Sequence, residues 1–258
     1  MIDSKMDVNL LEEAIAGLVS RFRTSPFHFF SERELQAEFY GMCRRNFGAA
    51  KPKDSDIEVP LFRHEYNTVW RYRRARTGAP RSDSFQLRLD DGGVAGSLDI
   101  AILNAEFVRS CELLVVINKD ERRRASIRGR AASLPGAIDA AIEFKMAHVR
   151  DAPTVRQSAI NELSHGVFED CRKLGHENPA HAYMLAFSHE DGPSTDAAQR
   201  ILNGGNDEFA RIWSGPIRLL LATPITTYLK GPWVTPTGSR TPNPFEETMH
   251  NRDAVTAQ

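Results

Sequence analysis

The sequence predicts a single α/β (α+β) domain in which helices pack on a mixed central sheet. First, apolar helical patterns and strand-like runs follow one another in the order helix, strand, strand, strand, helix, strand. Second, the chain has 258 residues, of which 41% are hydrophobic and 26% charged, as in a soluble globular protein with ample core.

The first part of the chain predicts two helices. Residues 8–23 carry apolar side chains at helical spacing, and a short break follows at 24–26. Ser31 then opens a second helix, because Ser31 and Glu34 have the spacing of a capping box. The core stripe of this second helix is formed by Leu35, Phe39 and Met42.

The next segment predicts strands. Residues 59–72 are rich in aromatic and β-branched side chains, which favour strands. The runs 85–89 and 97–103 flank an Asp-Asp-Gly-Gly sequence at 90–93, which is typical of a hairpin turn. Residues 113–117 fit a buried strand or a short helical segment equally well.

The second half alternates between the two kinds of element. A basic loop is expected at 119–130, and Pro135-Gly136 then introduces a strand over 137–146. Residues 155–174 form an amphipathic helix, with apolar positions at helical spacing. Further elements are expected as a strand at 182–187, a helix at 197–202 and a strand at 217–222.

These elements suggest a division of the chain into three parts. Residues 1–26 form an N-terminal helix, and residues 27–229 form the main domain with an insertion around 104–134. Residues 230–258 are rich in Pro, Thr, Gly and polar side chains, so they read as a flexible tail. Such a tail buries little surface, and residues 231–258 should be dispensable for folding.

Two carboxylates and one ammonium stand out in the strand-like runs. Glu143 and Lys145 are two residues apart, so they project from the same side of their strand, ~6.6 Å apart along its axis. Asp99 lies in the run 97–103, with apolar residues on the opposite face. Adjacent strands lie ~4.8 Å apart, so Asp99 would meet Glu143 around one cation if these two strands pair. The alternative is an edge strand with a solvated polar face, unrelated to Asp99.

This arrangement resembles the active site of the PD-(D/E)XK nuclease superfamily, which includes many restriction endonucleases and Holliday-junction resolvases. The match covers Asp99, Glu143 and Lys145, and Leu98 stands where the superfamily's name has Pro. The order of elements over residues 27–190 is similar to the αβββαβ core of the restriction endonuclease-like fold, although the stretch between Asp99 and Glu143 is longer. The resemblance implies a Mg²⁺-dependent (endo)deoxyribonuclease with DNA as its partner and Mn²⁺ as a substitute ion.

The resemblance also implies a role for each residue. Asp99 and Glu143 would hold the Mg²⁺ ion, with the backbone carbonyl of Phe144 as a further ligand. Lys145 would orient the attacking water or help to deprotonate it, and would stabilise developing charge. Asp139 is on the Glu143 face but ~13 Å away along the strand, so a structural role is expected for it.

Superfamily members often place a Glu from the first core helix near the metal. Glu32 and Glu38 are the two candidates here, because Glu34 already has an explanation as a capping residue. Glu32 opens the helix and Glu38 flanks its buried stripe. The alternative for both is an ordinary helix-surface acid.

Two basic clusters are candidates for DNA phosphate contacts. The net charge of −1 gives no global attraction to nucleic acid, so binding must depend on local segregation of charge. The alternative is solvated loop charge. The candidate residues are Arg71, Arg73 and Arg74 in the first cluster, and Arg122, Arg123 and Arg124 in the second.

The remaining features favour a cytoplasmic protein. Three widely separated cysteines suggest neither a disulfide framework nor a zinc site, and no apolar stretch approaches the ~20 residues needed to span a membrane. The first residues lack the pattern of a secretory signal.

Duplex cutting would favour a homodimer or a second active site. The competing function is a non-catalytic nucleic-acid-binding or assembly subunit that retains the nuclease fold.

Overall fold

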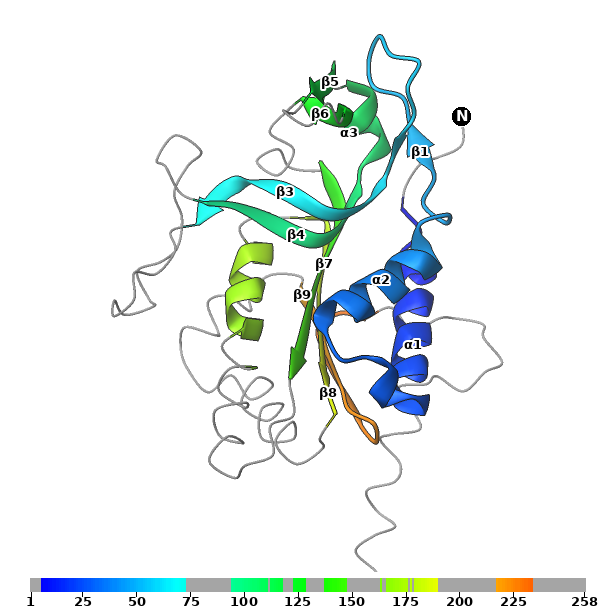
Figure 1. Cartoon of the computed structure of the whole chain (residues 1–258), viewed down its shortest axis with the longest axis vertical. Helices are drawn as coiled ribbons and strands as arrows, with labels where there is room; N and C mark the ends of the chain where they lie inside the picture. The colour runs from blue at the N-terminus through cyan, green and yellow to red at the C-terminus, as the bar shows by residue number, and fades with distance from the viewer. Residues whose placement is uncertain are drawn as a thin grey trace, which may run out of the picture. The chain divides into compact units, whose positions relative to one another are not determined.

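The computed structural model describes ten segments of the chain. They are residues 6–72, 94–110, 112–117, 123–128, 137–147, 163, 166–175, 177, 179–189 and 217–233, and the side-chain description leaves out 67–72, 94–96, 112–117 and 123–128. The described elements form a mixed α/β structure whose main sheet has the order β10-β9-β8-β7-β4-β3 (Figure 1). The chain divides into two compact units, which are described separately.

The first unit comprises Met1–Met6, Arg44–Ile142 and His176–His181. Antiparallel pairing joins β3 to β4 and β4 to the first half of β7. Two smaller antiparallel pairs, β1 with β2 and β5 with β6, belong to the same unit. The elements of this unit are β1 (Ala49–Ala50), β2 (Val59–Pro60), β3 (Phe62–Tyr72), β4 (Val94–Leu103), α3 (Ala105–Ser110), β5 (Glu112–Ile117), β6 (Arg123–Arg128) and β7 (Ile138–Ala147), the last of which continues into the second unit.

The second unit comprises Asp7–Cys43, Glu143–Gly175 and Ala182–Gln258. Its helices α1 and α2 lie side by side on one side of β8 and β9, and the helix of residues 166–175 lies on the other side (Figure 1). Strands β8 and β9 are parallel, whereas β9 and β10 are antiparallel, so the sheet is mixed. The elements are α1 (Val8–Thr24), the 3₁₀ helix η1 (Pro26–His28), α2 (Glu32–Cys43), β8 (His181–Ser188), β9 (Ile217–Ala222) and β10 (Thr227–Lys230).

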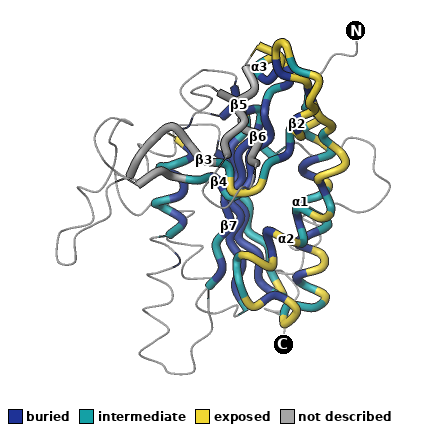
Figure 2. Tube along the Cα trace, turned by 45° about the horizontal axis from the view of Figure 1, so that its top comes forward, coloured by how far each residue is buried: buried dark blue, intermediate teal, exposed yellow. Residues whose placement is uncertain are grey.

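Local sequence explains why α1 and α2 begin where they do. The Asp7 carboxylate accepts hydrogen bonds from the backbone N–H groups of Asn9 and Leu10, at 2.9 and 3.3 Å. The Glu34 carboxylate accepts one from the Ser31 N–H at 2.9 Å, as expected for one half of a capping box. Apolar residues of both helices then face the core, and Figure 2 shows buried residues along the strands and exposed residues along the outer faces of α1 and α2.

Three polar side chains contact one another in the core of the second unit. The Tyr183 hydroxyl donates to Glu12 Oε1 at 3.1 Å, and Arg218 Nε lies 3.0 Å from the same oxygen. The Arg218 guanidinium also lies over the Tyr183 ring, 5.1 Å from its centre. Trp233 packs edge-on against that ring at 5.7 Å. Trp233 falls in the segment expected to be a tail. Removing Trp233 would therefore remove a ring contact in this unit that the sequence did not predict.

Most of the predicted strands and helices that fall on described residues are confirmed. The basic segment 119–130 is the exception, because residues Arg123–Arg128 form β6 and not a loop. Helix α3 and strand β10 were not predicted. The expected run at 85–89, the turn at 90–93, the first part of the 155–174 helix and the helix at 197–202 lie outside the described residues.

Candidate active site

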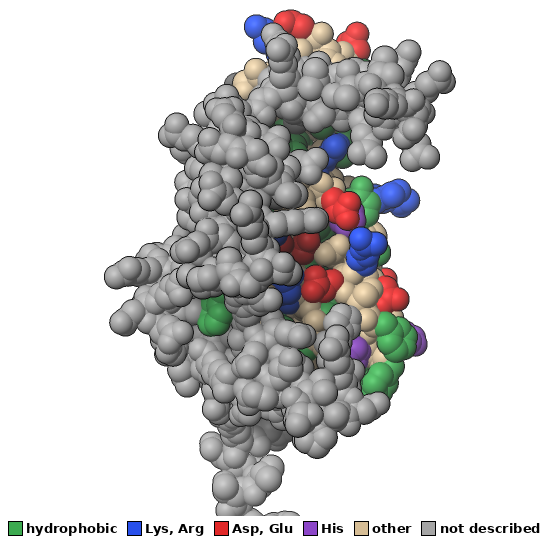
Figure 3. All heavy atoms as spheres, turned by 60° about the vertical axis from the view of Figure 1, so that its left-hand side comes forward, with side chains coloured by type: hydrophobic (Ala, Val, Ile, Leu, Met, Phe, Trp, Pro, Cys, Tyr) green, Lys and Arg blue, Asp and Glu red, His purple; other side chains and the backbone are tan. Residues whose placement is uncertain are grey.

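Five charged side chains meet in the second unit. Lys145 Nζ lies 2.9 Å from Asp170 Oδ2 and 3.5 Å from Glu32 Oε2. Lys173 Nζ lies 2.6 Å from Glu143 Oε2 and 3.2 Å from Asp170 Oδ1. Asp170 therefore joins the two ammonium groups, and these five residues are called the charge cluster. Acidic and basic side chains are also interspersed on the described part of the face in Figure 3.

Three elements position the charge cluster. Glu143 and Lys145 are two residues apart in β7, so they share one face of the strand, as the sequence predicts. Asp170 and Lys173 are three residues apart on the helix of residues 166–175 and therefore lie on one face of it. Glu32 belongs to the first turn of α2, where a carboxylate also interacts favourably with the helix dipole.

The charge cluster is largely withdrawn from water. The side chains of Glu143 and Asp170 are 1% and 11% exposed, and those of Lys173 and Lys145 are 15% and 25% exposed. Buried charges are costly unless they are paired, so each carboxylate needs a cation close by. Carboxylates outnumber ammonium groups by one in this cluster, which leaves it with a formal negative charge.

The electrostatics of the charge cluster keep Lys145 protonated. Burial lowers the pKa of Lys145, but the carboxylates of Asp170, Glu32 and Glu143 outweigh burial and raise that pKa above its ordinary value. An ammonium with a raised pKa is a poor proton acceptor at neutral pH. Lys145 is therefore suited to orienting a bound group and stabilising negative charge, and unsuited to removing a proton from water.

A glycine makes room for the Lys145 side chain. A Cβ atom added at Gly166 would lie 3.0 Å from Lys145 Cδ and 3.1 Å from Lys145 Cε, closer than ordinary carbon contacts. The absence of a side chain at position 166 thus lets the methylene stem of Lys145 run against the helix on its way to Asp170.

The expected pairing of the strands that carry Asp99 and Glu143 is confirmed in the first unit. Strands β4 and β7 are antiparallel, with Ile100 opposite Ile142 and Ala101 opposite Ala141. Asp99 precedes Ile100 in β4 and is half-buried, whereas Leu98 and Ile100 are fully buried. The alternation of faces predicted for this strand is therefore observed.

Asp139 has a local structural environment in the first unit. Asn104 donates a hydrogen bond from Nδ2 to Asp139 Oδ1 at 2.9 Å, and Asn104 Oδ1 accepts one from the Phe107 N–H at the start of α3. Burial raises the pKa of Asp139. The Asn104 hydrogen bond and the nearby His181 lower this pKa by less, so the net shift is upward. These contacts agree with the structural role expected for Asp139.

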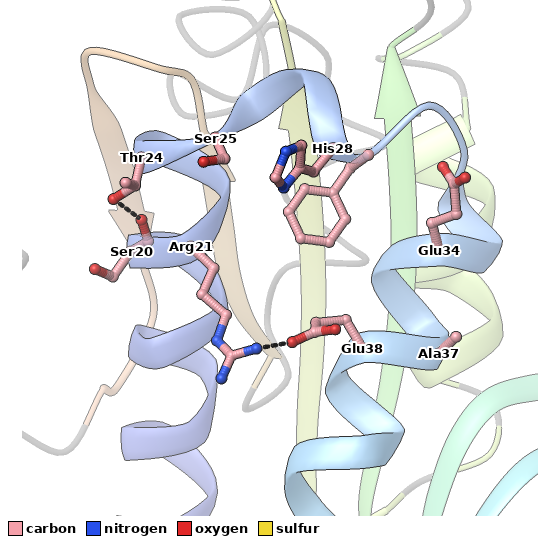
Figure 4. Close-up of a pocket in the computed structure, with 9 residues that line it drawn as sticks. Ser20, Arg21, Thr24, Ser25, His28, Glu34, Ala37 and Glu38 are labelled. Carbon is pink, nitrogen blue, oxygen red and sulfur yellow. Dashed lines mark hydrogen bonds and ion pairs between the residues drawn. The ribbon is translucent and has the colours of Figure 1, made fainter.

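The three glutamates of α2 have different surroundings. Glu32 lies in the charge cluster, and Glu34 accepts hydrogen bonds from the N–H groups at the start of α2. Glu38 forms an ion pair with Arg21 across the gap between α1 and α2, where Figure 4 shows the two side chains pointing toward each other. That gap is an open pocket of about 680 Å³. Of the three, Glu32 is the one found next to Lys145.

The remaining candidates are placed as follows. Phe144 is fully buried, and its ring packs against that of Phe39 on α2, with ring centres 5.7 Å apart. Arg71 lies in β3, and Arg123 and Arg124 lie in β6, where the structure describes the backbone and not the side chains. Outside the described residues are Arg73, Arg74 and Arg122.

Within the described part of the chain, no group of three or more His, Cys, Asp or Glu residues is arranged to hold a metal ion. None of the described helices is long and apolar enough to cross a membrane. Comparison of the chain with protein-family models, with curated proteins and with solved structures finds no match.

Sequence reasoning missed three residues of the site, namely Asp170, Lys173 and Gly166. A signal for two of them is present. Asp170 is three residues after Val167 and four before Leu174, both of which are fully buried, so a charged side chain flanks the apolar stripe of the helix. Asp170 and Lys173 are three residues apart, so the helix presents one acidic and one basic side chain on the same face.

Proposed function

We propose that this protein is a metal-dependent nuclease that hydrolyses DNA phosphodiester bonds, with a PD-(D/E)XK-like site formed by Asp99, Glu143 and Lys145. The observation that carries the proposal is the burial of Glu143 and Lys145 among opposite charges on one face of β7. Ordinary strand-surface charges are solvated, and buried charges gather preferentially at functional sites. The order α2, β3, β4, β7, helix and β8 supports a restriction endonuclease-like core as part of the same proposal.

The donor groups suit a magnesium ion. Mg²⁺ prefers oxygen ligands, and Asp99, Glu143 and the Phe144 carbonyl would supply them. Glu143 has a cationic partner in Lys173, which fits a carboxylate that requires positive charge beside it. When bound, the ion would neutralise phosphate charge and acidify a water molecule.

The residues of the charge cluster would orient the substrate. Lys145, kept protonated by its carboxylate neighbours, would stabilise negative charge on the scissile phosphate. Asp170 and Glu32 would fix the Lys145 ammonium through contacts at 2.9 and 3.5 Å. A preorganised cation of this kind contributes to catalysis because it needs no rearrangement during the reaction.

A non-catalytic nucleic-acid-binding or assembly subunit is the second candidate. One observation favours it: Glu143 and Asp170 already have ammonium partners, as in a purely structural ion-pair network. Such a network would need no metal. A protein of this kind would show no rise in melting temperature with Mg²⁺ or Mn²⁺.

The test is cleavage of plasmid, branched and single-stranded DNA with Mg²⁺ or Mn²⁺. Asp99→Ala and Glu143→Ala should each abolish metal-dependent cleavage, because each removes a metal ligand. Lys145→Ala should abolish cleavage while metal binding survives. Glu13→Ala, which alters an exposed acid on α1, is the matched control and should cleave normally. Wild-type rates in Lys145→Ala would contradict the mechanism, and a lack of cleavage on every substrate would favour the second candidate.

A further inference from the structure

Lys173 has an unusual position for a residue outside the predicted triad. Its ammonium lies 2.6 Å from Glu143 Oε2, the shortest ion-pair distance within the charge cluster. The Glu143 side chain is 1% exposed, so this carboxylate depends on its immediate neighbours for compensation of charge. The Lys173 ammonium therefore occupies the position beside Glu143 Oε2 that a metal ion bound to this oxygen would take.

We propose that Lys173 is a built-in competitor of the metal: its ammonium neutralises Glu143 in the metal-free protein and moves away when a divalent cation binds there. This inference rests on the proposed function, since it assigns Glu143 to the metal. An ammonium and a divalent cation cannot both lie against the same carboxylate oxygen without strong repulsion. Binding of the ion at Glu143 Oε2 then exchanges one positive partner of this oxygen for another.

Asp170 makes this exchange feasible. Lys173 is already 3.2 Å from Asp170 Oδ1, so the ammonium keeps a carboxylate partner when it leaves Glu143. A rotation about the terminal bonds of the lysine stem is sufficient, because both carboxylates are within reach of the same side chain. Asp170 also contacts Lys145 at 2.9 Å, so the displaced charge would remain beside the ammonium that faces the substrate.

The competition has a measurable consequence for metal affinity. Removing the Lys173 charge leaves Glu143 without its resident cation, and a Mn²⁺ ion no longer has to displace one. We expect Lys173→Met to bind Mn²⁺ about tenfold more tightly than the wild type, a change typical of losing one close charge interaction. Lys173→Arg keeps the charge and should retain the wild-type affinity. Lys53→Met makes the same replacement at an exposed position and is the control.

The experiment is calorimetric titration of Mn²⁺ into the full-length wild type and these three variants. Equal affinities for the wild type and Lys173→Met would overturn the role of Lys173 and leave the proposed function standing. No Mn²⁺ binding by any of the proteins would overturn both. Tighter binding by Lys173→Met, with Lys173→Arg and Lys53→Met unchanged, is the result that the proposal requires.

A second measurement uses the wild type alone and therefore does not depend on the folding of a variant. Acetylation of lysines by an amine-reactive ester, followed by mass spectrometry, reports how accessible each ammonium is. Mn²⁺ should speed the labelling of Lys173, which is 15% exposed in its contact with Glu143, and should leave Lys53 unchanged. A Lys173 labelling rate that is unaffected by saturating Mn²⁺ would overturn the proposal.

Discussion

The replacement Gly166→Ala tests whether the Lys145 side chain is held in place as the structure indicates. A Cβ atom at position 166 would approach Lys145 Cδ to 3.0 Å and Cε to 3.1 Å. Ordinary carbon contacts are ≈3.5–4.0 Å, so the lysine stem or the helix must move by a few tenths of an ångström. Lys145 cannot easily give way, because Asp170 and Glu32 both hold its ammonium.

The expected magnitude follows from two opposing effects. A Gly→Ala change in a helix usually stabilises by ~0.5–1 kcal/mol, whereas overpacking costs ~1–3 kcal/mol. Gly175→Ala is the matched control, because the same helix has open space around position 175. We therefore expect Gly166→Ala to be less stable than Gly175→Ala by about 1–2 kcal/mol.

Urea unfolding measures this difference in stability, and plasmid cleavage measures its effect on the site. A catalytic group displaced by ~1 Å can cost ~100-fold in rate, so a shift of a few tenths of an ångström should make Gly166→Ala cleave several-fold more slowly than Gly175→Ala. Equal stability and equal cleavage rates in the two variants would show that the Lys145 side chain does not run against Gly166.

Three further predictions concern other parts of the chain. Replacing Arg122, Arg123 and Arg124 with Ala should weaken DNA binding across all sequences and flatten its salt dependence, and an unchanged salt slope would exclude this segment. Burial raises the pKa of Cys43 from 9.0 to about 12, so the thiol ionises at a lower pH in the unfolded chain than in the folded protein. The free energy of unfolding should accordingly fall between pH 9 and 12, less steeply in Cys43→Ala, and identical slopes would contradict this. Ending the chain after Lys230 should lower the melting temperature, because it removes the ring of Trp233 from Tyr183, whereas ending it after Trp233 should not.

The sequence predicts those parts of the fold that depend on local patterns. The alternation of Leu98, Asp99 and Ile100 is enough to place β4, and the spacing of Glu143 and Lys145 is enough to put them on one face of β7. Strand β6 was missed because five of its six residues are Arg, Ser or Ala, a composition that is more typical of a loop than of a strand. Its pairing with the apolar β5 is a contact that a local pattern does not encode.

The partners within the charge cluster could not be predicted for a similar reason. Glu32, Glu143 and Asp170 are far apart in the chain, and the distances between them and the lysines depend on packing. The sequence leaves Glu32 and Glu38 equally plausible as neighbours of Lys145, and only the tertiary contacts place Glu32 beside Lys145 and Glu38 beside Arg21. Buried polar partners of this kind are specified by tertiary contacts and not by periodicity.

The most direct test of the proposed metal site is a crystal structure of the wild type soaked with Mn²⁺, with the ion located by its anomalous scattering. We expect an anomalous peak at about 2.0–2.2 Å from carboxylate oxygens of both Asp99 and Glu143, as for a hard octahedral ion. Lys173 should then contact Asp170 and no longer contact Glu143. A saturating soak that leaves no peak at Glu143, with Lys173 still paired to it, would contradict the metal site.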